Sequence, residues 1–452
     1  MKTLTKHPSG SFSELLSIAV PLILTALSGN LFVFVDRIML SYYSFDVFNA
    51  VSGVGVVFAT LCYPGCAIAA ITEVFVGQYN GSGQYDKIAA PVWQMIFFAI
   101  ASIVVYVPLA LLGESLFLSP VFVKEGLLYY QILVIGAPLF LLQNAMAGFF
   151  IGVGRAGFVT AAVLISNLMN IILNYVLIFG FWIIPPLGAA GSATASMIAE
   201  SFQLIILFGV FFNKRNHLKY LTRKASLNLK LLWEQLTIGV PGAVGHTFEI
   251  GGWAFLSNFR AGLGDAYVTV MSVSGASYLL FSFYTEGLQK AVTAITSNMI
   301  GSRDYRNIEK AKRSAFVLQA LFLVLIFIPL VAWSEISIRP LIDIELLTPE
   351  TLFAIKMALL GNFLFMIFDG YYWIYCGMLT AGGDTKTVMV VNSVSVWLFC
   401  VLPSVIWLTY FPSESYTVSL YSFPIYGAIV TGILYLRVRS NKWIKLDLSK
   451  AK

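Results

Sequence analysis

Charged residues are scarce in this chain of 452 residues, because Asp, Glu, Lys and Arg together make up only 11% of it. An average soluble domain carries roughly 25% charged residues, so the composition excludes an ordinary soluble fold. Hydrophobic residues make up 58%, and the mean hydropathy is +0.83. Once membrane-length segments are assigned, no stretch remains that is long enough for a soluble domain.

Cysteine and histidine are also rare. The four cysteines lie inside apolar stretches, where a scattered cysteine behaves as a small hydrophobe, and they form neither a disulfide framework nor a zinc-binding spacing. An intramembrane enzyme would need paired aspartates, a serine with a lysine or histidine, or an HExxH motif, and none of these appears. We therefore expect no catalytic activity, no metal centre and no cofactor.

Long apolar stretches are what the sequence has instead. A helix that crosses a bilayer needs about 20 apolar residues, and twelve stretches reach that length. Their centres lie near Val33, Phe58, Ile100, Ile135, Ile172, Ile205, Gly251, Leu279, Leu323, Ile367, Val396 and Ile429. The sequence therefore predicts an all-α integral membrane protein with twelve transmembrane helices.

Several short sequence motifs occur twice, once in each half of the chain. The segment Glu14–Pro21 in the first half resembles Glu234–Pro241 in the second. Ala70-Ile71-Thr72 with Gly77 recurs as Ala294-Ile295-Thr296 with Gly301, and Gly152, Ala156, Gly157, Thr160 and Asn167 recur as Gly377, Ala381, Gly382, Thr385 and Asn392. The offset between the two copies is nearly constant along the chain, so one duplicated unit fills it, as in many secondary transporters.

The duplication predicts the organisation of the chain. We expect an N-terminal six-helix lobe at residues 1–213, a basic linker at residues 214–230 and a C-terminal six-helix lobe at residues 231–452. Because six is an even number, both lobes enter the membrane in the same direction, and their pseudo-symmetry axis should follow the membrane normal.

The net charge of +6 is explained by basic residues that gather in the loops on one side of the membrane. Basic residues gather in the linker, in the loop after the eighth span and in the tail after Arg437, whereas acidic residues mark the loop after the ninth span: Glu335, Asp343, Glu345 and Glu350. By the positive-inside rule both termini face the cytoplasm. The basic residues do not interleave with aromatic ones on a soluble face, so we expect no nucleic-acid partner.

Three acids stand almost alone inside apolar spans: Asp36, Glu249 and Asp369. An acid at the centre of a spanning helix costs about 2.5–3.5 kcal/mol on insertion scales, so each is a candidate functional residue. Such a carboxylate lowers this cost by taking up a proton or by coordinating a small cation. A purely structural role as a polar contact between helices is the alternative, and it is stronger for Asp36.

Other ionisable groups are more ambiguous. Glu286 and Lys290 are spaced as i and i+4, so they are as well explained by a self-neutralising pair as by a site. Glu73 and Glu200 lie near the ends of their spans, where a carboxylate reaches water. His246 precedes Glu249 by three residues on one helical face and is a candidate to modulate it.

The order and spacing of several motifs are typical of one family. They are Ala19-Val20-Pro21 leading to Val35-Asp36, Gly77-Gln78-Tyr79-Asn80-Gly81, Asn170-Ile171-Ile172-Leu173-Asn174 followed by Gly188-Ala189-Ala190-Gly191, and Ala381-Gly382-Gly383-Asp384-Thr385. With these motifs the chain resembles the MATE (multidrug and toxic compound extrusion) transporters, and their NorM branch more than their DinF branch. The resemblance implies two pseudo-symmetric six-helix lobes around a central cavity, with export by alternating access in antiport with Na⁺ or H⁺.

The resemblance also implies roles for individual residues. Glu249 and Asp369 match acids that form the cation-linked site of the C-terminal lobe in NorM-like members. The polar cluster of the N-terminal lobe is matched by Asp36, Asn170, Asn174 and Ser196. Asn174 and Ser196 stand where DinF-like members carry aspartate and threonine, which weakens the prediction of an ion there. Phe365 replaces a tyrosine that NorM members often carry, so a hydroxyl ligand is lost.

The substrate is predicted only by class. Aromatic residues make up 15% of the chain, and candidates for substrate or modulating contacts near Asp369 are His246, Phe365, Tyr371, Tyr372 and Trp373. Rings beside a buried acid suit a flat lipophilic cation, although tyrosine and tryptophan also gather at membrane interfaces. We expect multidrug efflux of small organic molecules by a monomer in the inner membrane of a bacterium. A flippase or exporter of a lipid-linked or endogenous metabolite is the alternative, and an intramembrane enzyme is a remote one.

Overall fold

The computed structural model describes residues 4–118, 120–411 and 414–450. In its first half the helices are α1 (Phe12–Tyr43), α2 (Phe45–Ala70), α3 (Thr72–Ser82), η1 (Tyr85–Lys87), α4 (Ala89–Ala101), α5 (Ile103–Leu112), α6 (Glu114–Phe117), α7 (Pro120–Gly152), α8 (Ala156–Phe179), α9 (Gly188–Phe211) and α10 (Lys214–Tyr220). Within the described residues, bridged extended backbone is limited to the pair Phe181 and Ile184.

The second half has a similar series. Its helices are α11 (Leu229–Ala261), α12 (Asp265–Gly301), α13 (Tyr305–Phe327), η2 (Ile328–Ala332), α14 (Glu335–Ile338), η3 (Ile344–Leu346), α15 (Pro349–Ala381), α16 (Thr385–Val396), η4 (Trp397–Val401), α17 (Leu402–Tyr410), η5 (Val418–Ser422), α18 (Phe423–Arg439) and η6 (Leu448–Lys450). The short segments η2, η4 and η5 are π-helical turns that continue the neighbouring helices.

Eleven helical segments in the described part of the chain are long and apolar enough to cross a membrane. The twelfth predicted span is α11, whose 33 residues extend about 50 Å at 1.5 Å per residue. Its hydropathy is lower because glycines and the polar side chains of His246 and Glu249 interrupt it. The all-helical membrane fold is thus confirmed, with eleven spans recognised by hydropathy and one by length.

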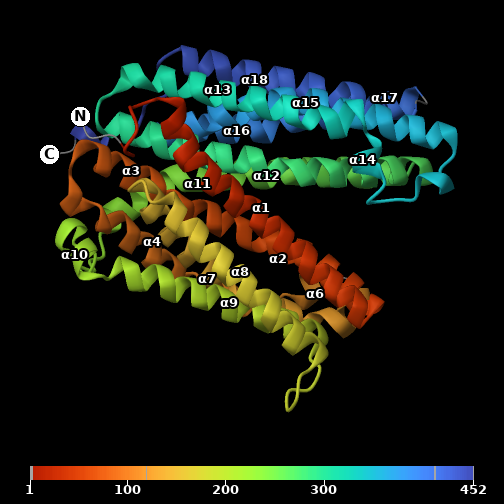
Figure 1. Ribbon diagram of the computed structural model, residues 1–452, viewed down its shortest axis with the longest axis horizontal. Helices are drawn as coiled ribbons and strands as arrows, with labels where there is room; N and C mark the ends of the chain where they lie inside the picture. Colours follow the sequence, from red (N-terminus) through yellow and green to blue (C-terminus); the bar gives the residue numbers. More distant parts are fainter. Residues whose placement is uncertain (1–3, 119, 412–413, 451–452) are drawn as a thin grey trace.

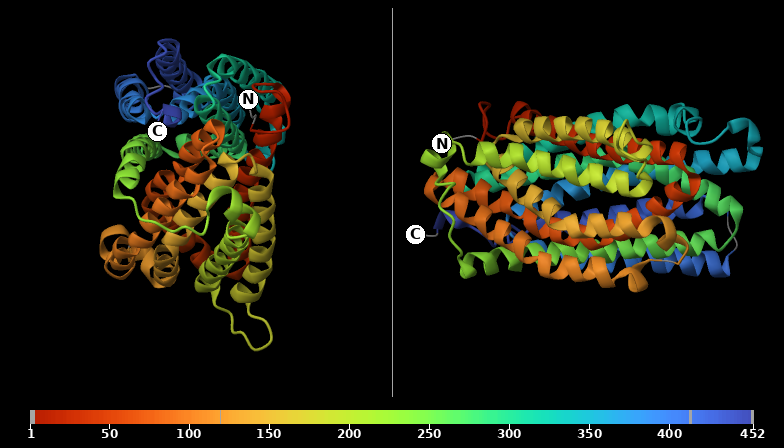
Figure 2. Two further views of the ribbon diagram at one scale, coloured as in Figure 1. Left: turned by 90° about the vertical axis from the view of Figure 1, so that its left-hand side faces the viewer. Right: turned by 90° about the horizontal axis from the view of Figure 1, so that it is seen from below.

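The long helices form two bundles. One contains α1 to α9 and the other α11 to α18, and the bundles lie against each other at the end that carries both chain termini and diverge toward the opposite end (Figure 1). The long helices run along the longest axis of the molecule (Figure 2). Basic α10 lies at the end with the termini, and α14 beside the acidic loop lies at the other end.

Packing within the bundles follows the same pattern twice. In the first bundle α1 packs on α8, α2 on α7 and α7 on α9, and in the second α11 packs on α16, α12 on α15 and α15 on α18. Contacts between the bundles are also paired, because α1 packs on α12 and α11 packs on α2. The duplicated sequence therefore builds duplicated packing. The predicted bounds of the lobes and linker stay predictions, and α10 occupies the first part of that linker.

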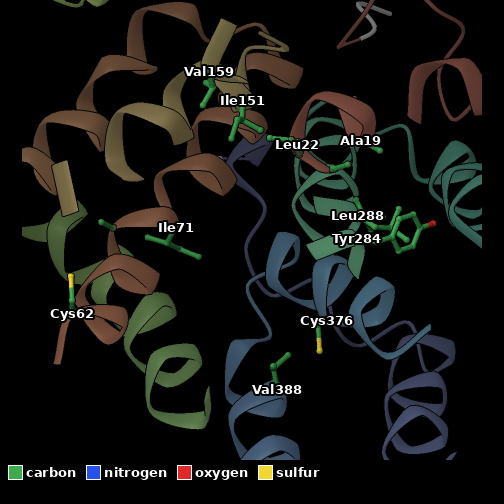
Figure 3. Packing of buried hydrophobic residues seen from close by; sticks show 14 of the residues in the cluster. Ala19, Leu22, Cys62, Ile71, Ile151, Val159, Tyr284, Leu288, Cys376 and Val388 are labelled. Atoms are coloured by element: carbon green, nitrogen blue, oxygen red, sulfur yellow. The ribbon is translucent and has the colours of Figure 1, made fainter. Parts of the chain in front are cut away.

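The contact of α1 with α12 depends on small and apolar side chains. Ala19 and Leu22 lie on the part of α1 that runs beside α12, which carries Tyr284 and Leu288 (Figure 3). At Gly287 an added Cβ atom would lie 2.6 Å from the backbone of α1, so only glycine permits the two helices to approach this closely. This close approach holds the bundles together in the middle of the molecule.

The register of the repeat differs from the sequence prediction in two places. A Cβ atom added at Gly81 would meet Asn298, and one added at Gly301 would meet Gln78, so these contacts are reciprocal. Gly301 is therefore the counterpart of Gly81, and its predicted pairing with Gly77 is wrong by one helical turn. A shift of one turn keeps the same apolar face of a helix and so escapes pattern matching.

The later part of the repeat shows the same error. Gly154 and Gly383 both have a positive φ, of 80° and 75°, in the turns that precede α8 and α16. These turns have the same hydrogen bonds, from Arg155 N to Phe150 O and from Asp384 N to Leu379 O. Gly154 is therefore the counterpart of Gly383, and the predicted pairing of Ala156 with Ala381 is also wrong by one turn.

Candidate functional site

A small pocket lies inside the second bundle, between α11, α15 and α18. Its walls are Glu249, Phe365, Asp369, Tyr372, Tyr426, Gly427 and Val430. The cavity volume of about 10 Å³ is near the smallest that holds one water molecule. Two acids from different helices therefore face one water-sized space inside the membrane region.

Glu249 is held by polar neighbours. Its side chain is 10% exposed, and its Oε2 accepts a hydrogen bond from Asn392 Nδ2 at 3.1 Å. Asn392 in turn accepts a bond of 2.5 Å from the hydroxyl of Tyr372, and His246 Nδ1 lies 3.4 Å from Glu249 Oε2. This chain of contacts from α15 through α16 to α11 orients the carboxylate toward the pocket.

Asp369 has fewer partners. Its side chain is 5% exposed, and its Oδ2 has no hydrogen-bond partner among the described residues. Tyr278 of α12 and Trp373 approach the carboxylate, and Glu249 is close enough to act on it electrostatically. Two carboxylates in surroundings of low dielectric constant repel each other unless a proton or a cation is shared between them.

Aromatic rings surround the acids. Phe365 packs against Trp253, Tyr278, Phe423 and Tyr426, with ring centroids 5.8–6.3 Å apart. Tyr278 and Tyr426 thus bring two hydroxyl groups close to Phe365, the position at which the tyrosine hydroxyl of many NorM members is missing in this chain. Both tyrosines were missed in the sequence, because they lie on α12 and α18, far from Asp369 in the chain.

The three aromatic residues after Asp369 point in different directions. Tyr372 lines the pocket, and the ring of Trp373 makes an edge contact with His246 at 6.4 Å. Tyr371 packs instead against Phe316 of α13, with centroids 4.8 Å apart. Successive helical residues are about 100° apart around the axis, so the structure does not bring Tyr371 to the pocket.

The predicted polar cluster of the first bundle also comes together, from α1, α8 and α9. Asp36 Oδ1 accepts hydrogen bonds from Asn174 Nδ2 at 3.1 Å and from Ser192 Oγ at 2.6 Å. Asn174 Nδ2 also donates to Asn170 Oδ1 at 2.7 Å, and Asn170 Nδ2 donates to Ser196 Oγ at 3.4 Å. Ser192 was missed, although its position one turn before Ser196 was a usable signal.

Arg37 lies apart from this cluster. An added Cβ atom at Gly55 of α2 would be 2.4 Å from its guanidinium group, which therefore points toward α2. Its Nη1 is buried without a hydrogen-bond partner in the described part of the chain. The hydrogen bonds to Asp36 thus come from neutral donors of α8 and α9, while Arg37 acts on the carboxylate only through its charge.

A charged pair marks the space between the bundles. Lys290 Nζ and Glu286 Oε1 of α12 are 2.7 Å apart, and their side chains are 39% and 53% exposed although they lie in the middle of the molecule. Tyr63 of α2 is also exposed, and its hydroxyl interacts electrostatically with Glu286 and Lys290. Accessible side chains of the two bundles therefore lie within electrostatic range of each other.

Glu73 and Glu200 are the remaining ambiguous acids. Glu73 is buried at the start of α3, where the charge of Lys290 acts on it, and its Oε1 has no partner among the described residues. Glu200 of α9 likewise has a buried Oε2 without a described partner. The four cysteines are free thiols, and the described residues include no group of three or more His, Cys, Asp or Glu side chains that could hold a metal ion.

Comparisons with known proteins agree on one family. The MatE family model matches residues 21–176 and residues 243–406. The chain is 23% identical over 394 residues to multidrug resistance protein MdtK of Photorhabdus laumondii, covering 85% of each chain. It is 25% identical over 400 residues to a probable multidrug resistance protein NorM of Mannheimia succiniciproducens, covering 85% of this chain and 83% of that protein.

A solved structure has the same fold. It shows an outward-facing conformation of a multidrug resistance MATE family transporter, with a TM-score of 0.84 and 17% sequence identity, and the match covers 98% of this chain and all of that one. The family model matches two segments of similar length, one in each bundle. That division agrees with the duplication of the sequence and of the helix packing.

Proposed function

The chain belongs to the MatE family, and on that basis we propose that it exports small organic molecules across a membrane in exchange for Na⁺ or H⁺. It is a multi-pass membrane transporter rather than an enzyme, and its relatives carry names of multidrug resistance proteins. Multidrug efflux is therefore the activity that its family, fold and buried acids support together.

The observation that carries the coupling proposal is the shared pocket of Glu249 and Asp369. The acids come from α11 and α15, and one carboxylate oxygen of Asp369 has no partner among the described residues. A cavity of about 10 Å³ accommodates a dehydrated cation or a water molecule but no drug, since drug pockets measure roughly 300–1,000 Å³. The pocket is thus the proposed site of the coupling ion.

The substrate would bind in the cleft between the bundles. Tyr63, Glu286 and Lys290 are exposed where α2 and α12 of the two bundles approach, and α12 also carries Tyr278, which packs against Phe365 of the acidic pocket. A lipophilic aromatic cation is held there by stacking and by attraction to the acids. Binding of such a cation and of the coupling ion would compete, because each neutralises the same pair of carboxylates, and antiport requires this competition.

The orientation of the protein in the membrane follows from the charge of its loops, and its conformational state follows from its shape. We propose that the termini and α10 face the cytoplasm, in the inner membrane of a bacterium, because basic loops remain on the cytoplasmic side. The bundles meet at that end and diverge at the other, so this conformation faces outward (Figure 1). Rocking of the bundles about the contacts of α1 with α12 and of α11 with α2 would open the cytoplasmic end.

Uptake into everted membrane vesicles, whose lumen corresponds to the outside of the cell, tests the proposal. Ethidium transport is followed by fluorescence while a pH gradient and a Na⁺ gradient are imposed separately, and vesicles without the protein serve as the control. We expect one gradient to drive transport and the other to have no effect. Transport that needs neither gradient, or no transport of any cationic dye alongside flipping of a labelled lipid, would contradict the proposal and favour the flippase alternative. Light scattering of the purified protein checks the expectation of a monomer.

A further inference from the structure

The C-terminal segment at residues 441–450 turns back across the boundary between the two bundles. Its backbone N–H groups at Lys445 and Leu446 donate to the carbonyl oxygen of Gly382, at 2.7 and 2.9 Å. An added Cβ atom at Gly382 would lie 2.5 Å from the ring of Trp443, so the buried indole packs directly on this glycine. These contacts attach the segment to the turn between α15 and α16 of the second bundle.

Charge strengthens this attachment. Asp384 is fully buried and forms ion pairs with Lys445 Nζ at 2.5 Å and with Arg437 Nε at 2.6 Å. Hydrogen bonds between ionised partners are roughly twice as strong as neutral ones. The second bundle therefore holds the segment more firmly than neutral contacts alone would.

The first bundle holds the same segment through one glutamine of α3. The side chain of Gln78 is 0% exposed, and its Nε2 donates to Leu446 O at 3.0 Å and to Ala381 O at 2.9 Å. Its Oε1 accepts a bond of 3.0 Å from Leu448 N. Nearby, Gln84 Nε2 donates to Leu448 O at 3.1 Å. All of these bonds cross from one bundle to the other and join neutral groups.

Two other segments cross between the bundles at this end. The segment before α1 reaches α13, where Ser314 Oγ donates to Gly10 O at 2.9 Å. The segment before α11 reaches α4, where Gln94 Nε2 donates to Ser226 O and Gln94 Oε1 accepts from Asn228 N. These two crossings are counterparts in the repeat and lead directly into the first helix of each bundle. The crossing at residues 441–450 differs from them, because it follows the last helix of the second bundle and leads into no further helix of a bundle.

We propose that residues 441–450 form a latch that keeps the bundles together at the end carrying both termini, and that its release from Gln78 controls opening at that end. The proposal rests on the rocking motion inferred above. When the bundles separate there, the segment must lose either its neutral bonds to Gln78 and Gln84 or its attachment to Gly382 and Asp384 through Lys445 and Leu446. The neutral bonds break first, so the segment moves with the second bundle.

Gln94 provides a matched control for Gln78. Both glutamines are fully buried in the first bundle, and each donates two hydrogen bonds and accepts one. The partners of Gln94 outside its own helix lie in the non-helical linker at residues 224–228, which we expect to stay bound to α4 when α11 tilts. Gln94→Ala should therefore lower thermal stability as much as Gln78→Ala without favouring the open state.

The experiment measures distances between spin labels at Asp86 and Arg439, which are exposed in the first and second bundles near the proposed latch. Pulsed electron paramagnetic resonance is applied to the full-length protein in lipid nanodiscs, without drug or gradient. The distribution of distances between the labels gives the ratio of open to closed molecules. Gln78→Ala should raise this ratio by about tenfold, in line with loss of several net-favourable hydrogen bonds. Gln84→Ala, which removes one partly exposed partner, should raise it less.

Each result decides the proposal. Equal distance distributions for Gln78→Ala, Gln84→Ala and the wild type would overturn the latch, as would an equal shift in Gln94→Ala. If Gln78→Ala fails to fold, Gln84→Ala still carries the test. A wild-type distribution that stays single and unchanged with substrate, proton and Na⁺ would instead contradict the rocking motion, so failure of the latch and failure of the proposed function are distinguishable.

Discussion

In the first bundle the carboxylate of Asp36 accepts hydrogen bonds from Asn174 and Ser192, whereas in the second bundle an oxygen of Asp369 has no partner among the described residues and faces a cavity beside Glu249. The main helix pairs pack in a similar pattern in the two bundles. The duplicated backbone therefore supports different chemistry. Neutral donors and the nearby charge of Arg37 act on a lone acid in one bundle, while two acids in the other leave room for a cation.

The largest expected effect comes from removing the charge at this second site. Asp369→Asn and Glu249→Gln keep the size of the side chains, so each protein should insert normally. Each should abolish ethidium efflux driven by the effective gradient, because the coupling of about 1–3 kcal/mol typical between linked sites disappears with the charge. Everted vesicles with equal protein content, quantified by immunoblot, provide the measurement.

Asp36→Asn tests the other side of the comparison. It should lower the melting temperature, because hydrogen bonds to a charged acceptor contribute about 1.5–3 kcal/mol, and it should retain gradient-driven efflux. If Asp36→Asn abolishes efflux while Asp369→Asn and Glu249→Gln transport at the wild-type rate, then the roles of the two bundles are reversed. The coupling ion would in that case bind at Asp36, Asn170 and Asn174.

An intermediate effect is expected from the prolines inside α1 and α11. Each proline removes a backbone hydrogen bond and loosens its helix where the bundles rock. The carbonyl oxygen of Pro21 also accepts a bond of 2.8 Å from Thr160 of α8, and the described residues show no such contact at Pro241. Pro241→Ala should therefore slow turnover more than Pro21→Ala, and both should leave the affinity for substrate nearly unchanged.

Single-turnover efflux and equilibrium binding of ethidium separate these two quantities. A mutant in which binding weakens and turnover does not would show that the proline shapes the substrate site. If Pro21→Ala and Pro241→Ala slow turnover equally, then the hydrogen bond from Thr160 to Pro21 does not distinguish the two helices.

The smallest expected effect concerns two adjacent tyrosines of α15. Tyr372→Phe removes the donor to Asn392, which orients Glu249, so efflux should fall by a fewfold. Tyr371→Phe is the matched control, because Tyr371 packs against Phe316 away from the pocket, and it should leave the efflux rate unchanged. Initial rates of ethidium efflux at saturating gradient compare the two. A larger loss for Tyr371→Phe would place substrate contacts on the α13 side of α15.

Much of the candidate site was predictable from the sequence. Asp36, Glu249 and Asp369 were recognised because an isolated acid in an apolar span is costly, and that signal needs no knowledge of the fold. Asn392 and Tyr278 were not recognised as site residues, because polar and aromatic side chains are common in spans and only their neighbours give them a role. Tyr371 lies away from the pocket and packs against Phe316, because adjacency in the chain does not place residues on one face of a helix, and its predicted role as a substrate contact stays a prediction.

The sequence by itself determined the membrane fold, the duplication and the difference in charge between the loops at the two ends of the molecule. Hydropathy, repeated motifs and loop charge are properties of short segments and can be recognised without the fold. Only the tertiary structure decided which distant residues meet, as when Asn392 of α16 reaches Glu249 of α11 and Leu448 near the C-terminus reaches Gln78 of α3. The one-turn errors in the repeat have the same origin. A shift by one turn preserves the apolar face of a helix, and only contacts with neighbouring helices distinguish the two registers.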